Sequence, residues 1–240
     1  MIYLNRIKEV NLIEFKNWRQ IIFILTMINC IQSLFLTYLA ILFYPGGTFS
    51  DTSTNGFVFF GNLFSDLGRT IAHSGELNLA SSIIYNVSLF LMGVLLIPFF
   101  IAIPYLFRKT GEGKGLAKIC AVLGIVVGTG MIGASLMPAD LYYQIHVNFG
   151  YLSFIALLPY TILFILAIFQ NKTYPNQYAY IYLVFGIIQV IFLLIMSFST
   201  SEQGILTVFA AGQSIVVISM TVCFFIQAYG AWKLQTTMGD

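Results

Sequence analysis

Six long apolar stretches fill most of this chain, and the charged residues stand almost entirely between them. A helix needs about 20 apolar residues to cross the hydrocarbon core of a bilayer, and each stretch approaches or exceeds that length. The runs are continuous and do not alternate every second residue, which favours helices over barrel strands. The pattern predicts an all-α polytopic membrane protein, a six-transmembrane-helix bundle with spans at residues 21–43, 82–107, 119–137, 147–169, 178–198 and 205–229.

The composition agrees with this class. Hydrophobic residues make up 59% of the 240 positions and charged residues only 8%. A soluble domain of this size could not hide so much apolar surface from water. We expect one transmembrane domain at residues 21–232, with an interfacial cytoplasmic segment before it at residues 1–20 and a cytoplasmic tail after it at residues 233–240.

The basic residues divide unequally between the two ends of the predicted bundle. Ten of the eleven Lys and Arg residues lie on the side of the termini, and only Arg69 lies on the other side. Basic residues mark the cytoplasmic side, so we expect both termini in the cytoplasm and a multi-pass protein of the plasma membrane. Because topology accounts for these charges, we expect the lipid bilayer as a partner and no nucleic acid.

The longest connection, residues 44–81, would then lie outside the cell and carries most of the polar chemistry. Between residues 56 and 76, apolar and polar residues recur at steps of three and four, which predicts an amphipathic helix. The apolar face would hold Phe57, Phe60, Phe64, Leu67 and Ile71, and the polar face Asn62, Asp66, Arg69, His73 and Glu76. The polar face is either a solvated surface with internal pairing to Arg69, or one wall of a site.

A second polar group lies between the third and fourth spans, where Asp140, His146 and Asn148 occur. Both histidines of the chain therefore fall on the outer side, beside acidic residues. If this connection approaches the long outer segment, one binding site would form. Its members would be Asp66, Arg69, His73, Glu76, Asp140, His146 and Asn148.

Four of these residues are candidate metal ligands: Asp66, His73, Asp140 and His146. Histidine and carboxylate groups suit zinc or another divalent metal, which would be the cofactor and would activate water for hydrolysis. No local ligand spacing such as His-x-x-x-His occurs in the chain. A lone histidine at a membrane interface is more often a structural, hydrogen-bonding residue.

Small and amide residues within the spans point to helix packing. The third span carries Gly124, Gly128, Gly130 and Gly133, which favour close contact with neighbouring helices. Amide side chains within the spans, such as Gln189 and Gln213, more often hold helices together than conduct ions.

Several short motifs resemble one family. They are Tyr44-Pro45-Gly46, Phe64-Ser65-Asp66-Leu67-Gly68, Asn86 to Gly93, Gly130-x-x-Gly133, Pro138-x-Asp140 and His146. From about residue 20 to 232 the chain resembles the six-helix bacterial and archaeal membrane proteins of domain of unknown function 998. Their layout is similar to that of DRAM and FGF-receptor-activating-protein-like membrane proteins. The resemblance implies a six-span fold with the Ser-Asp-Leu-Gly and Pro-x-Asp…His elements outside, and it implies no activity.

Three functions remain open from the sequence. The first is binding or moving a lipid or small molecule through an outward-facing polar cavity. The second is a metal-dependent membrane hydrolase acting on a lipid-type substrate at the outer leaflet. It has a distant analogy in the alkaline ceramidase and adiponectin-receptor enzymes, which use a Ser, an Asp and three His around zinc. The third is a regulatory subunit that packs against a membrane-protein partner. We rank binding or transport first.

Overall fold

The computed structural model describes residues 18–198 and the backbone of residues 203–237, with the side chains of the latter from residue 207 onward. The long helices are α2 (Trp18–Phe43), α3 (Leu79–Ala102), α4 (Lys114–Leu136), α5 (Tyr143–Gln170), α6 (Gln177–Phe198) and α7 (Gln203–Thr237). A 3-10 turn, η2 (Ile103–Phe107), continues α3. Within this part of the chain, six helices are long and apolar enough to cross a membrane, so the prediction of six apolar helices is confirmed. The interfacial segment expected at residues 1–20 lies, up to residue 17, outside the described residues.

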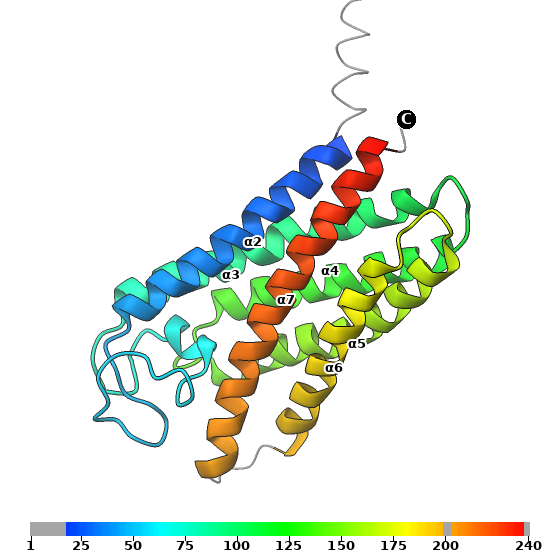
Figure 1. Cartoon of the computed structure of the whole chain (residues 1–240). Coiled ribbons are helices and arrows are strands. Elements are labelled where there is room, and N and C mark those ends of the chain that lie inside the picture. The colour runs from blue at the N-terminus through cyan, green and yellow to red at the C-terminus, as the bar shows by residue number, and fades with distance from the viewer. Residues whose placement is uncertain (1–17, 199–202, 238–240) are drawn as a thin grey trace, which may run out of the picture.

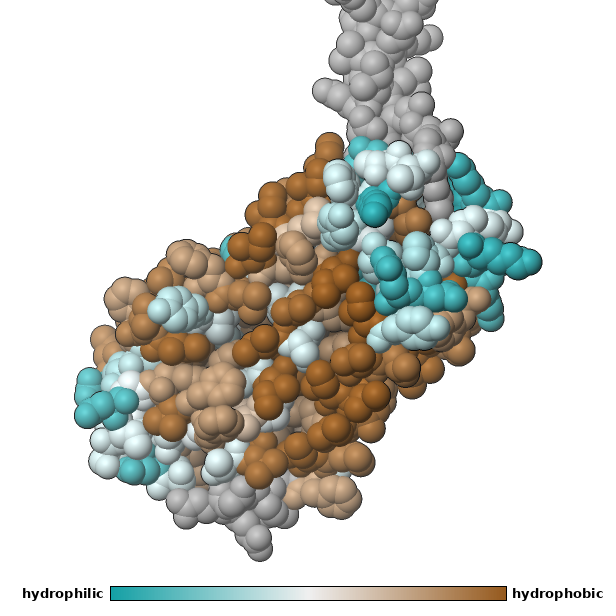
Figure 2. All heavy atoms as spheres, in the orientation of Figure 1, coloured by the Kyte–Doolittle hydropathy of each residue, from teal (hydrophilic) through white to brown (hydrophobic). Residues whose placement is uncertain are grey.

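The six helices form a closed ring. Each helix packs against the next one along the chain, and α7 returns to pack against α2 (Figure 1). The start of α2 and the end of α7 lie at the same end of the ring, and the long connection between α2 and α3 lies at the other. The side surface of this view is largely apolar, with polar residues gathered toward the ends (Figure 2).

Glycines on α4 bring its two neighbours close, as the sequence predicts. A Cβ atom on Gly93 of α3 would lie 2.7 Å from the carbonyl oxygen of Gly128. A Cβ atom on Gly130 would lie 2.8 Å from the carbonyl oxygen of Phe149 on α5. The backbones of α3, α4 and α5 therefore approach one another more closely than larger residues would permit.

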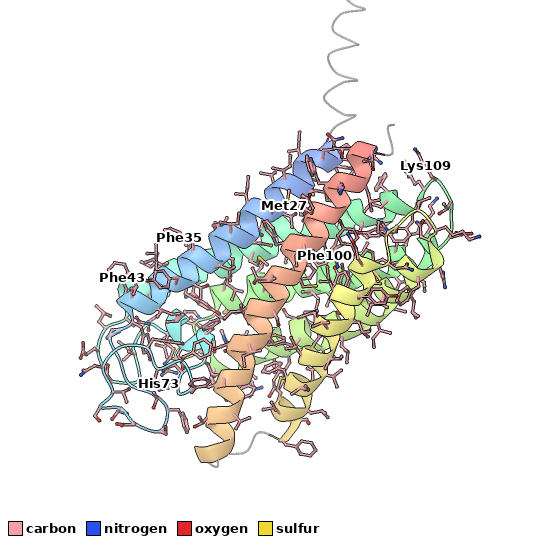
Figure 3. All side chains as sticks on the ribbon, in the orientation of Figure 1. Met27, Phe35, Phe43, His73, Phe100 and Lys109 are labelled. Carbon is pink, nitrogen blue, oxygen red and sulfur yellow. The ribbon has the colours of Figure 1, made fainter. Side chains whose placement is uncertain are left out.

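Aromatic side chains fill the interior of the helix ring near its middle. The ring of Phe100 lies 5.0 Å from that of Tyr160 and 5.5 Å from that of Phe224, centre to centre, and all three side chains are buried. Phe100 is labelled in Figure 3, beside α7. These edge-on contacts between aromatic side chains join α3, α5 and α7 and fill the interior of the helix bundle at this level.

The long connection is not the amphipathic helix that its periodicity predicts. Between residues 44 and 78 the chain forms turns, two isolated bridges and one short 3-10 helix, η1 (Phe64–Gly68). Glycines impose this shape, because Gly47 has φ +79° and a Cβ atom there would overlap the backbone of Ser74. The segment folds as a compact cap against α2, α3 and α7, with Leu67 and Phe64 buried beneath it.

Candidate functional site

Asp66 and His73 form the centre of this cap. The imidazole Nε2 of His73 lies 3.0 Å from Oδ1 of Asp66. The other carboxylate oxygen, Oδ2, accepts hydrogen bonds from the backbone N–H of Leu63 and the side-chain amide of Asn62. Asp66 is therefore buried with both oxygens occupied, and the pairing with Arg69 considered from the sequence is replaced by pairing with His73.

Tyr44 fixes the same network to the end of α2. Its hydroxyl donates to the carbonyl oxygen of Gly47 and accepts from the backbone N–H of His73, each at 3.3 Å. Burial raises the pKa of Tyr44 to about 12, so the hydroxyl keeps its proton. Asn62 donates to the same carbonyl of Gly47. These polar residues hold the cap together from within and do not form a solvated stripe.

Asp140 connects the α4–α5 turn to the cap, as expected if the two segments meet. Its carboxylate accepts hydrogen bonds from the backbone N–H and hydroxyl of Thr70 and from the backbone N–H of Ile71. Partial burial opposes ionisation, but these bonds outweigh it and lower the pKa of Asp140 below its ordinary value. Asp140 thus acts as an ionised clamp between two loops.

His146 sits on the first turn of α5 and caps the end of α4. Its Nδ1 lies 2.8 Å from the carbonyl oxygen of Met137 and 3.1 Å from that of Ala134. A carbonyl can only accept, so Nδ1 carries the proton and donates. In the neutral ring Nε2 is then an acceptor. Because His146 lines both cavities described below, this acceptor is a candidate ligand contact.

The four proposed metal ligands do not form one ligand set. Across the described residues, no group of three or more His, Cys, Asp or Glu side chains is placed to hold a metal ion. Asp66 and His73 are paired with each other, Asp140 is occupied by Thr70 and Ile71, and His146 Nδ1 by α4 carbonyls. These residues therefore do not fit the zinc site considered from the sequence.

A cavity of about 780 Å³ opens beside the cap. This is within the range of roughly 300–1,000 Å³ that holds small-molecule ligands. Its polar wall carries Asp66, Arg69 and His73 of the cap and His146 of α5. The other walls come from α5, α6 and α7 and are mostly aromatic or aliphatic: Tyr143, Val147, Tyr151, Phe154, Phe192, Met196 and Phe209.

A smaller apolar pocket of about 80 Å³ adjoins this cavity deeper in the ring. Five residues line both spaces and form the boundary between them, called the neck below: Ser65, His146, Gly150, Phe154 and Gln213. Beyond the neck the walls are Leu89, Val127, Met131, Leu157, Val217 and Met220. The side-chain oxygen Oε1 of Gln213 is buried without a hydrogen-bond partner among the described residues. An unpaired buried acceptor is costly, which marks this position as one that a ligand could satisfy.

The pocket has a closed floor. Met220 lies one turn before Phe224 on α7, and Leu157 lies three residues before Tyr160 on α5. Phe224 and Tyr160 belong, with Phe100, to the aromatic group that fills the interior. The cavity therefore ends within the molecule and is not a through-pore in this structure.

The predicted site residues divide into two groups. Asp66, Arg69, His73 and His146 line the cavity, and Asp140 supports it through Thr70. Glu76 and Asn148 are exposed and line neither space; the amide of Asn148 accepts a hydrogen bond from Gln144 instead.

Sequence reasoning missed most of the neck. Ser65, Gly150 and Phe154 were not candidates, and Gln213 was interpreted as a helix-packing residue. A signal existed for Gln213, an amide within an apolar span. For Gly150 and Phe154 no sequence signal was available, because their role depends on where α5 and α7 stand in the ring.

Comparison with protein-family models, with curated proteins and with solved structures gives no match.

Proposed function

We propose that this chain is a multi-pass plasma-membrane protein that binds an amphiphilic or small-molecule ligand in the one-ended cavity beside its cap. With the termini in the cytoplasm, as the basic residues favour, the cavity opens to the outer side. The observation that carries the proposal is the polarity gradient along the cavity. A polar mouth at Arg69 and His73 leads through a neck to an apolar end above a closed floor. A closed floor favours binding over conduction through a fixed pore.

Gly150 gives a direct test. It lies on α5 at the neck, and a Cβ atom added there would meet no atom within 4 Å. Gly150→Leu should therefore fill the neck without displacing a helix. Gly115→Leu on α4 is the matched control, because Gly115 is also helical, equally free of neighbours and exposed away from the cavity.

The measurement is native mass spectrometry of the purified protein with its co-purifying small molecules. We expect ligand on the wild type and on Gly115→Leu, and loss of most of it on Gly150→Leu. Equal ligand on all three proteins, each with an unchanged circular dichroism spectrum, would contradict the proposal.

Hydrolysis is the second candidate, and one observation favours it. Ser65 and His146 line the same neck, and the Nε2 of His146 is available to accept a proton from a nucleophile. A hydrolase of this kind would lose turnover of a lipid ester in both Ser65→Ala and His146→Ala while keeping the ester bound. Simple binding would leave no turnover to lose.

A further inference from the structure

The cavity extends along the contact between α5 and α6, and residues of both helices line it. Contacts between these helices extend from Phe164 and Tyr182, with ring centres 5.3 Å apart, to Phe154 and Phe192 at 4.9 Å. Farther from the floor, Val147 of α5 and Met196 of α6 both line the cavity.

Two tyrosines of α5 line the same stretch of the cavity. Tyr143 and Tyr151 both line the cavity, and 67% and 42% of their surfaces are exposed. They stand on one face of α5 with Val147, at steps of four residues. In a six-span bundle the outside of α5 and α6 faces lipid, so separation of the two helices at this level would connect the cavity with the bilayer.

The polar wall of the cavity carries a cationic side chain, that of Arg69, which could bind an anionic ligand. Arg69 lines the cavity, and within the described residues its guanidinium has no carboxylate within ion-pairing distance. Its Nε donates to the carbonyl oxygen of Ile71, which anchors the side chain and leaves the terminal nitrogens available. Both oxygens of Asp66 are engaged by Leu63 and His73, so this carboxylate does not pair with Arg69.

Two side chains of the neck, His146 and Gln213, provide hydrogen-bond acceptors. With the proton of the neutral ring on Nδ1, which donates to α4, Nε2 of His146 is a hydrogen-bond acceptor. Oε1 of Gln213 has no partner among the described residues. A molecule that fits both regions carries an anionic oxygen group for Arg69 and a hydroxyl or amide N–H donor for the neck.

We infer that the occupant is an anionic amphiphile from the membrane itself. Its phosphate or carboxylate binds Arg69, its hydroxyl or amide donor meets His146 and Gln213, and its chain passes between α5 and α6 into the bilayer. This inference rests on the proposed function and adds the ligand class and the route of entry.

The first experiment tests the head group. The protein is reconstituted in phosphatidylcholine nanodiscs that contain three competing probes of equal chain length: a lysophosphatidic acid, a fatty acid and a monoacylglycerol. Native mass spectrometry then measures which probe is retained. We expect at least one anionic probe to exceed the monoacylglycerol by roughly tenfold or more, as a charge-assisted hydrogen bond implies. The better of the two anions distinguishes a phosphate from a carboxylate head.

Two variants isolate the charge. Arg69→Gln and Arg69→Lys both remove the Nε bond to Ile71, but only the second keeps the cation. We expect Arg69→Gln to abolish the preference for the anion and Arg69→Lys to retain most of it. Equal retention of monoacylglycerol by the wild type, or an unchanged preference in Arg69→Gln, would overturn the assignment of an anionic head.

The second experiment tests the route. Val147→Trp should obstruct passage between α5 and α6, and Val122→Trp, at a 63% exposed position on α4, is the matched control. We expect Val147→Trp to slow the uptake of a long-chain lysophosphatidic acid from the bilayer several-fold, with a short-chain, water-soluble homologue unaffected. Equal slowing of both homologues, or of neither, would overturn lateral entry.

The outcomes separate this inference from the function on which it rests. If Gly150→Leu removes bound amphiphile but no preference for anions is found, the cavity binds ligands and only the ligand class is wrong. If Gly150→Leu retains every probe as the wild type does, the proposed function itself fails.

Discussion

At the scale of single residues, Asp140 shows how a polar residue identified from sequence can have a structural role. It lies 70 positions from Thr70, yet its carboxylate accepts three separate donor groups from Thr70 and Ile71. Two of these donors are backbone N–H groups, which carry no side-chain signature. The sequence could therefore predict that the two segments approach each other, but not that Asp140 clamps the cap and does not line the cavity.

Removing this charge should loosen the cap. Asp140→Asn keeps one carbonyl oxygen but loses the charge and one acceptor, so we expect the unfolding free energy to fall by about 1–3 kcal/mol. Glu76→Gln removes an exposed acid of the same cap and should change it by less than about 0.5 kcal/mol. Denaturation of both variants in the same detergent measures the difference. An equally large loss of unfolding free energy in Glu76→Gln would contradict the stabilising role assigned to Asp140.

The same clamp predicts a pH dependence with a defined sign. The folded-state pKa of Asp140 lies below the ordinary value of 3.8, so the unfolded chain takes up its proton first as pH falls. The stabilisation is present above the unfolded pKa and is lost as pH falls through the lower, folded one. Wild type should therefore lose more stability than Asp140→Asn when acidified below about pH 4. If the unfolding free energies of the two proteins fall in parallel with pH, Asp140 is not the cause of the acid sensitivity.

At the scale of elements, the helices were predictable and the cap was not. Long apolar runs specify membrane helices because the bilayer leaves few alternatives for the backbone. Residues 56–76 have a helical period, but Gly47, Gly56 and Gly75 at positive φ turn the chain, and Asn62 and Asp66 bond to its backbone. Local hydrogen bonding and turn chemistry thus override periodicity in this segment.

The glycines of α4 give a prediction at this scale. Gly130 faces the backbone of Phe149, so Gly130→Leu should push α5 away and destabilise the bundle by about 1–3 kcal/mol, the usual cost of overpacking. Gly115→Leu adds the same side chain to the same helix where no atom lies within 4 Å, and should be neutral or slightly stabilising. Thermal unfolding in detergent compares the two. Equal melting temperatures would mean that the α4–α5 interface accommodates the larger side chain without loss of stability, which would contradict the prediction.

At the scale of the whole molecule, the cavity arises from the closure of the ring. Its walls come from the cap and from α5, α6 and α7, and its floor from α3, α5 and α7. No short motif encodes such a space, because it depends on α7 returning to α2 across the full length of the chain. The resemblance to a six-helix family stays a prediction. A structure of a member of that family would test it, by showing whether its six helices form the same closed ring.

The direction of the cavity depends on the orientation of the ring, which single cysteines can establish. The native residues Cys30, Cys120 and Cys223 are buried, so background labelling should be low. Ser50→Cys places an exposed thiol on the cap, and Thr110→Cys places one on the α3–α4 turn at the opposite end of the ring. With cytoplasmic termini, a membrane-impermeant maleimide should label Ser50→Cys in intact cells and Thr110→Cys only after permeabilisation. The reverse result would turn the mouth of the cavity toward the cytoplasm and move the proposed ligand to the inner leaflet.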